Sequence, residues 1–303
     1  MLRYFFIWIQ AARLRTLPLS LAGIILGNAL ALGDPFFDYQ IFVLALLTAT
    51  GFQVLSNFAN DYGDGIKGTD NAMRIGPQRV LQQQLLSPKA LLTGILVTAL
   101  ISFGLAMALI ITAFDGVFDT MAWFFLFLAI AAIVAAFKYT VGKDAYGYVG
   151  LGDFFVFVFF GLVAVMGSYF LQTQSLSLIS LCFALSMGLL SVAVLNLNNM
   201  RDYKSDRESH KQTLVVLIGL KAAKGYHLSL IVLAIALSVW GGFQAGFLPI
   251  QYLFGLSFLP LLWHLRIFYG IENERDYDGQ LKLVALSSFF LAVGLWIGMV
   301  LGG

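Results

Sequence analysis

Apolar stretches close to 20 residues long recur along almost the whole chain, and this is the length that an α-helix needs to cross the hydrocarbon core of a bilayer. Only 11% of the 303 residues are charged, whereas a soluble domain carries roughly a quarter. The sequence therefore predicts an all-α integral membrane protein, a bundle of about nine transmembrane helices in a single polytopic domain over residues 1–303. The nine stretches lie at about 17–33, 39–60, 90–114, 121–139, 153–171, 178–198, 225–244, 250–265 and 282–301.

The least regular of these stretches is the eighth, because it contains Pro260 and is surrounded by Gly-rich and Phe-rich sequence. Residues 1–16 precede the first stretch. They are aromatic and amphipathic, with no small-residue cleavage site after them, so they predict an interfacial segment and not a cleaved signal.

The 18 Lys and Arg residues occupy only alternate connections between the predicted spans. They precede the first span or follow the second, fourth, sixth and eighth, and the other connections hold only acidic residues or no charge. Because positive charge marks cytoplasmic loops, the N-terminus is expected in the cytoplasm and the C-terminus outside. The net charge of +2 gives no indication of a nucleic-acid partner.

Two acidic clusters end the second and sixth predicted spans, at the same expected depth. In the first cluster Asn57, Asp61 and Asp64 share one helix face, and Asn60 lies beside them. The second cluster has Asn198, Asp202 and Asp206 at steps of four. Carboxylates are costly near a bilayer, which makes such clusters candidate functional sites. One cluster by itself is most often a helix stop, but two of them predict facing half-sites.

The side chains in these clusters favour a hard cation, because they offer oxygen ligands without His or Cys. Mg²⁺ typically combines a couple of carboxylates with water and substrate phosphate. Basic residues lie in the same cytoplasmic loops, so the sequence predicts a site for a polyanion such as diphosphate. These residues are Lys67, Arg74, Arg79, Lys143, Arg201, Lys204 and Lys211. A secondary transporter is the alternative from another class, since repeated motifs also occur in repeat-built carriers.

With these motifs the chain resembles the intramembrane aromatic prenyltransferase superfamily, in which two Asp-rich motifs bind a prenyl diphosphate through Mg²⁺ within a bundle of nine spans. The resemblance covers most of the chain and is strongest to the branch that prenylates 1,4-dihydroxy-2-naphthoate in menaquinone synthesis. Four stretches carry it: Arg15 to Pro18, Asn57 to Asp70 continuing to Arg79, Tyr146 to Gly161, and Asn198 to Leu214. The sequence departs from the family pattern by lacking a proline near Arg13 and by having Asp153 where Glu is commoner.

The resemblance implies transfer of a polyprenyl group from an allylic diphosphate to 1,4-dihydroxy-2-naphthoate, with loss of CO₂, giving demethylmenaquinone at the cytoplasmic side of a bacterial inner membrane. Prenyl transfer to 4-hydroxybenzoate, homogentisate or haem stays an alternative. The expected catalytic and metal ligands are Asp61 with Asp64 and Asp202 with Asp206. The expected substrate-binding residues are Asn57, Asn60, Lys67, Arg74, Arg79, Tyr139, Lys143, Asn198 and Lys211. The loop from Tyr139 to Lys143 matches a Tyr-x-x-x-Lys pattern of the superfamily, and its contact with the diphosphate is implied by that resemblance alone.

Overall fold

The computed structural model describes residues 2–69 and 75–303, and their regular structure is almost entirely helical. The side chains described begin at Tyr4. The helices are α1 (Leu2–Ala12), η1 (Leu14–Thr16), α2 (Leu17–Ala31), α3 (Tyr39–Lys67), α4 (Pro88–Ala113), α5 (Thr120–Lys138), η2 (Tyr146–Tyr148), α6 (Gly152–Val156), η3 (Phe157–Gly167), α7 (Ser168–Thr173), α8 (Leu178–Arg201), α9 (Tyr203–Glu208), α10 (Leu214–Gln244), η4 (Pro249–Ser257), α11 (Phe258–Phe268), η5 (Glu274–Asp276) and α12 (Tyr277–Gly302).

Eight helical segments within the described ranges are long and apolar enough to cross a membrane. They correspond to eight of the predicted spans, so the all-α membrane class is confirmed. The remaining predicted span, at 250–265, is divided in the structure. Its first half is the 3₁₀ helix η4 and its second half is α11, with the change at Ser257. The total of nine spans and the orientation of the termini stay predictions.

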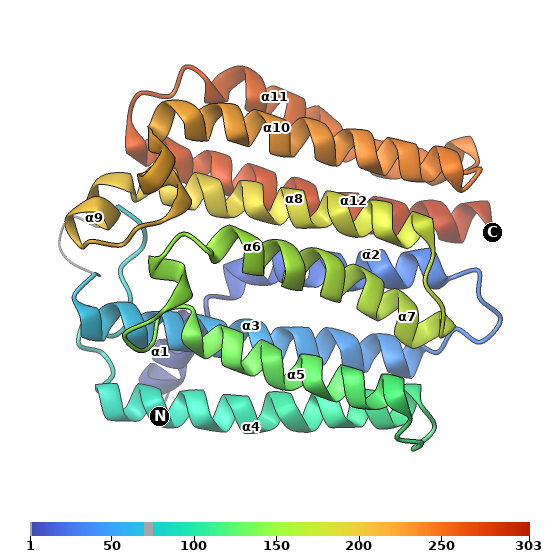
Figure 1. Ribbon diagram of the computed structural model, residues 1–303, viewed down its shortest axis with the longest axis horizontal. Helices are drawn as coiled ribbons and strands as arrows, with labels where there is room; N and C mark the ends of the chain where they lie inside the picture. The colour runs from blue at the N-terminus through green and yellow to red at the C-terminus, as the bar shows by residue number, and fades with distance from the viewer. Residues whose placement is uncertain (1, 70–74) are drawn as a thin grey trace.

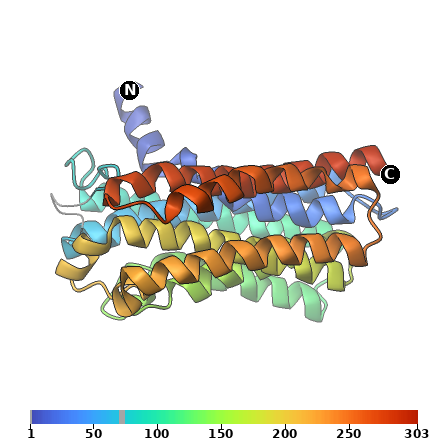
Figure 2. The same cartoon turned by 90° about the horizontal axis from the view of Figure 1, so that it is seen from above.

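The long helices run roughly parallel to one axis of the bundle (Figure 1). Helix α9 and the connections that follow α3 and α5 gather at one end of the bundle. The short connections that follow α2, α4, α7 and α10 gather at the other end. Seen from above, α1 projects from the bundle at a steep angle, and the two termini lie towards opposite ends (Figure 2). Within the described residues, the basic connections that follow α3, α5 and α8 therefore share the end that carries α9 (Figure 1).

Three helices approach each other closely because glycines remove side chains where they cross. Gly27 of α2 lies against the backbone of Val165 in the π-helix η3, and a Cβ there would overlap the Val165 oxygen. Gly161 of η3 meets α8, where an added Cβ would lie 2.6 Å from the Ala184 oxygen. Small residues allow such backbone approach in membranes, where van der Waals packing drives helix association. The large buried core joins α2 and η3 to α8, α10 and α12.

A buried histidine pair connects the divided eighth segment to its neighbours. The Nε2 atoms of His227 in α10 and His264 in α11 lie 2.8 Å apart, and His264 Nδ1 lies 2.7 Å from Oε1 of Gln280 in α12. Both rings are fully buried beside Phe268. A buried polar group is costly unless it is hydrogen-bonded, so these contacts favour one arrangement of the three helices.

Candidate active site

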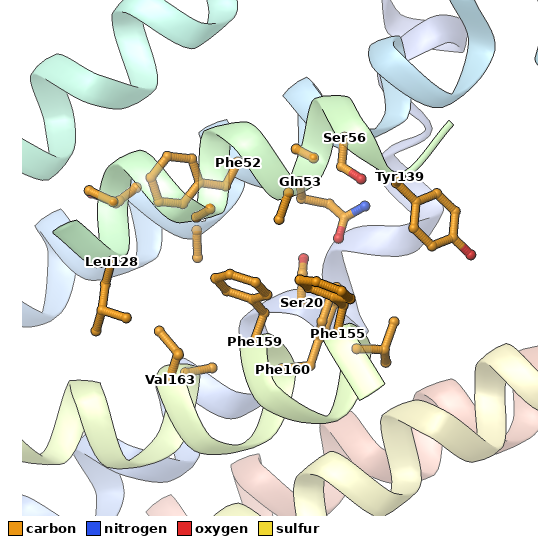
Figure 3. Close-up of a pocket in the computed structure, with 18 of the residues that line it drawn as sticks. Ser20, Phe52, Gln53, Ser56, Leu128, Tyr139, Phe155, Phe159, Phe160 and Val163 are labelled. Carbon is orange, nitrogen blue, oxygen red and sulfur yellow. The ribbon is translucent and has the colours of Figure 1, made fainter. Parts of the chain in front are cut away.

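A cavity of about 400 Å³ lies among α2, α3, α5 and the continuous helix formed by α6, η3 and α7. Its long wall is apolar, and its end beneath the basic loops is polar. Figure 3 follows this change of character from Leu128 and Val163, past the rings of Phe159 and Phe155, to Ser56 and Tyr139. The residues at the polar end are Arg13, Ser20, Gln53, Ser56, Asn60, Asp64, Arg79, Tyr139, Asn198 and Lys211. The cavity suits a ligand with an anionic head and an apolar tail.

Asp64 is the carboxylate at the polar end of this cavity, and it is almost fully buried at the last turns of α3. Its Oδ2 lies 2.6 Å from Nη1 of Arg79 and 3.9 Å from Nζ of Lys211. Its Oδ1 accepts a hydrogen bond from the Tyr148 hydroxyl at 2.7 Å. A buried carboxylate requires such partners, because burial of an unpaired charge is strongly unfavourable.

Lys211 brings the two acidic clusters of the sequence together. Its Nζ lies 3.9 Å from both Asp64 Oδ2 and Asp206 Oδ1, and the side chain is mostly buried. Burial by itself lowers the pKa of the Lys211 ammonium, but the carboxylates of Asp64 and Asp206 outweigh that effect and raise the pKa above its ordinary value. Lys211 therefore stays charged at physiological pH.

Asp61 and Asp202 belong to the same clusters but make different contacts. Asp61 accepts hydrogen bonds from the backbone N–H groups of Val80 and Leu81, at 3.2 and 3.3 Å. This contact holds the loop that carries Arg79. Asp202 accepts two hydrogen bonds from Arg201, at 2.9 and 2.7 Å, and Arg201 reaches Asp278 at 2.7 Å.

The three predicted amides lie around the same end. Asn60 and Asn198 line the cavity, and Asn198 Oδ1 accepts from Arg201 at 2.8 Å. Asn57 is buried and is not among the residues that line the cavity, and its Nδ2 donates to the carbonyl of Ala12 at 2.8 Å. This contact connects α3 to the N-terminal segment, and the expected role of Asn57 in substrate binding stays a prediction.

The remaining predicted residues are more dispersed. Tyr139 and Arg79 line the cavity, whereas the ammonium of Lys67 lies 3.9 Å from the centre of the Tyr148 ring. Lys143 has an exposed side chain in the loop after α5. Arg74 lies outside the described residues.

Sequence reasoning missed Tyr148, Gln53 and Arg13 as candidate site residues. Tyr148 lies within a stretch quoted for the resemblance, but its contact with Asp64 spans 84 positions and has no local signal. Gln53 lies one turn before Asn57 on the same face of α3, so helical spacing offered a signal for it. Arg13 lines the cavity from the segment before α2.

Tyr148 is expected to act as a hydrogen-bond donor over the whole working pH range. Burial and then the nearby Asp64 carboxylate raise the pKa of its hydroxyl. We expect Tyr148→Phe to lower kcat/KM for the diphosphate about tenfold, the effect of one lost hydrogen bond to a charged group. The profile of kcat/KM against pH should keep its shape from pH ~7 to ~10, because the raised pKa keeps Tyr148 protonated there.

Tyr39→Phe is the matched control for this substitution, because Tyr39 is exposed at the opposite end of α3. Its rate should stay at the wild-type value. An alkaline limb that is present in the wild-type protein and absent from Tyr148→Phe would contradict the assignment.

The chemistry of the site fits a hard divalent cation. The acidic groups at the polar end offer oxygen only, and Asp64 and Asp206 already share one cationic group in the ammonium of Lys211. Within residues 2–69 and 75–303, no three His, Cys, Asp or Glu side chains come close enough to hold an ion by themselves. This arrangement suits Mg²⁺, which uses one or two carboxylates and completes its coordination with substrate phosphate and water.

Comparison with known proteins gives relatives over most of the chain. The chain is 39% identical over 297 residues to a 1,4-dihydroxy-2-naphthoate octaprenyltransferase of Haemophilus influenzae, which covers 97% of this chain and 96% of that protein. It is 44% identical over 224 residues to the enzyme of the same name from Escherichia coli K12, covering 74% of this chain and 72% of the relative.

Solved structures share the fold at low sequence identity. A UbiA homologue from Aeropyrum pernix K1 superposes with a TM-score of 0.69 at 16% identity, covering 95% of this chain and 97% of that chain. A homologue from Archaeoglobus fulgidus bound to DMAPP and Mg²⁺ has a TM-score of 0.61 at 15% identity, with coverage of 93% and 98%. The model of the UbiA prenyltransferase family matches residues 20–292, and this chain belongs to that family.

Proposed function

We propose that this protein transfers a polyprenyl group from an allylic prenyl diphosphate to 1,4-dihydroxy-2-naphthoate, with loss of CO₂, in menaquinone biosynthesis. The observation that carries the proposal is the group of Asp64, Arg79 and Lys211 at the polar end of a cavity whose remaining wall is apolar, with Asp206 3.9 Å from the ammonium of Lys211. The names of the bacterial relatives support the naphthoate as acceptor.

The diphosphate is expected to bind at the polar end of the cavity. Arg79 and Lys211 would donate to its oxygens, and Tyr139, Asn60 and Asn198 would complete its surroundings. Lys67, Lys143 and Arg74 would add positive charge in the loops above. Because Arg79 and Lys211 already contact the Asp64 carboxylate, their positions are fixed before substrate binds. Fixed charges that stabilise the leaving group without reorganisation are the usual source of such catalysis.

Mg²⁺ is the expected cofactor, and the carboxylates of Asp61, Asp64, Asp202 and Asp206 are the groups that would hold it. When bound, it would supply positive charge against the oxygens of the departing diphosphate. DMAPP and Mg²⁺ are bound together in the Archaeoglobus homologue, which supports this cofactor.

The apolar wall of the cavity has two expected tasks during transfer. It would accept the first isoprene units of the tail, since leaving them in water costs about 0.8 kcal/mol per methylene. It would also exclude water from the allyl cation that forms when the C–O bond breaks. The aromatic faces of Phe155 and Phe159, which line this wall, would stabilise that cation through cation–π contact.

The proposed location is a bacterial inner membrane, with the polar end of the cavity on the cytoplasmic side. The support is the charge distribution: the loops at the end with α9 hold the basic residues, and those at the other end hold none.

A product assay on detergent-purified protein tests the proposal. With 1,4-dihydroxy-2-naphthoate, octaprenyl diphosphate and Mg²⁺ we expect a prenylated, decarboxylated naphthalenediol, identified by mass, together with release of CO₂. EDTA should abolish turnover and added Mg²⁺ should restore it. Turnover of 4-hydroxybenzoate in place of the naphthoate would overturn the acceptor, and full activity in EDTA would overturn the cofactor.

A further inference from the structure

We propose that Gln53 is a specificity-determining residue that accepts a hydrogen bond from a ring hydroxyl of the aromatic acceptor. The inference rests on the proposed function and identifies where the second substrate lies. Gln53 lines the cavity one turn of α3 before Asn57, and about two and three turns before Asp61 and Asp64, so it lies nearer than they do to the apolar wall. It is therefore placed between the expected positions of the diphosphate and of the prenyl tail.

The orientation of the Gln53 amide follows from a chain of hydrogen bonds that begins at the backbone. The carbonyl of Ala12 can only accept, so the nitrogen of the Asn57 amide must face it, at 2.8 Å. The same nitrogen lies 3.0 Å from Thr16 Oγ1, and that hydroxyl itself donates to Arg13 O. Oδ1 of Asn57 is then the atom that faces Gln53, and it accepts from Gln53 Nε2 at 3.1 Å.

This chain leaves the carbonyl oxygen of Gln53 as the atom turned away from Asn57. In Figure 3 the Gln53 side chain extends into the cavity towards Ser20, with Ser56 and Tyr139 beside it and the rings of Phe155 and Phe160 below. The Ser20 hydroxyl donates to the carbonyl of Leu17 at 3.0 Å, so it too presents lone pairs to the cavity. Two oxygen acceptors above aromatic rings are suited to a flat aromatic molecule that carries hydroxyl donors.

An uncharged hydrogen-bond acceptor such as the Gln53 amide oxygen is the appropriate protein group for a transfer that proceeds with decarboxylation. The ring attacks the allyl carbon, a new C–C bond forms, and positive charge develops on the ring and its hydroxyl oxygens. With the prenyl group taking the place of the carboxylate, the electrons of the broken C–CO₂ bond restore the aromatic ring. No ring proton has to be removed, so the site requires no base. A hydrogen bond from the hydroxyl to Gln53 strengthens as that charge develops, because hydrogen bonds to charged partners are stronger.

Steady-state kinetics test this role in a thermodynamic cycle, in which the side chain is changed in one arm and the hydroxyl of the aromatic substrate is removed in the other. The enzymes are the wild type, Gln53→Leu and Gln53→Met, and the acceptors are 1,4-dihydroxy-2-naphthoate and its two analogues that lack one hydroxyl. Deleting a hydroxyl changes the intrinsic reactivity of the ring equally for every enzyme, so that contribution cancels in the ratio of kcat/KM values.

We expect the wild type to discriminate against one analogue at least about tenfold more strongly than either variant does. The variants should lower kcat/KM for the parent acceptor by about the same factor, with KM for the prenyl diphosphate unchanged. Gln244→Leu is the matched control, since Gln244 is exposed at the end of α10 and is not among the residues that line the cavity. Its rates should equal those of the wild type.

Three results would overturn the inference: equal discrimination by wild type and variants, an unchanged kcat/KM for the parent acceptor, or a raised KM for the diphosphate alone. Binding of the prenyl diphosphate with Mg²⁺, measured by calorimetry, shows that each variant is folded. If the wild type itself gives no product with the naphthoate, the proposed function fails, whereas naphthoate turnover that is insensitive to Gln53 overturns only this inference.

Discussion

Asp64→Asn is expected to lower kcat by about 10² to 10³-fold, the scale seen when one fixed electrostatic contact is removed from an active site. The Asp64 carboxylate lies 2.6 Å from Arg79 and 3.9 Å from Lys211, and it is nearly inaccessible to solvent. Asn keeps the shape and the oxygen that accepts from Tyr148, but it removes the negative charge. The variant should therefore fold and lose its ability to hold a divalent cation.

The same substitution should not weaken metal-free binding of the diphosphate, because the site becomes more positive by one charge. Calorimetry with inorganic diphosphate in EDTA checks this point, and the product assay with Mg²⁺ measures kcat. Asp115→Asn is the control, since Asp115 is exposed in the connection after α4 and its left-handed backbone suits Asn. Normal turnover by Asp64→Asn would contradict the role given to this carboxylate.

Gly27→Ala is expected to lower the midpoint of thermal unfolding in detergent by roughly 2 to 5 °C, because overpacking of a tight contact costs about 1 to 3 kcal/mol and a chain of this length has a large unfolding entropy. The new methyl group would meet the backbone oxygen of Val165 and lie 2.9 Å from Cβ of Ser168. Neither atom can move without shifting the continuous helix of η3 and α7 relative to α2. Since η3 also forms one wall of the cavity, the surviving folded protein should have reduced activity as well.

Gly104→Ala is the control for this substitution, because it should not lower the midpoint of thermal unfolding. Gly104 is exposed on α4, and no heavy atom lies within 4 Å of a Cβ built there. Alanine has the higher helix propensity, by up to about 1 kcal/mol, so this variant should be as stable as the wild type or more stable. Equal midpoints for Gly27→Ala and Gly104→Ala would show that the α2–η3 contact is looser than described.

Local patterns in the sequence predicted the parts of the site that depend on one helix. Asp61 and Asp64 share a face of α3 because helical spacing places them there. The same spacing identified Asp202 and Asp206 as candidates, although the structure places Asp202 at the junction of α8 and α9 and Asp206 in α9. The reasoning could not assign their partners. Asp61 accepts from Val80 and Leu81 N–H groups, which lie in a loop, and loop conformation has no such periodic signal.

The sequence by itself determined the membrane class, the positions of most helices and the two acidic clusters, because hydropathy and helical spacing are local properties of the chain. Only the tertiary structure decided that Lys211 lies between Asp64 and Asp206, that Tyr148 contacts Asp64 and that Asn57 orients Gln53. These contacts join residues of different helices and loops. Helix packing sets them through close approaches such as that of Gly27 to Val165, and no single segment encodes such an approach.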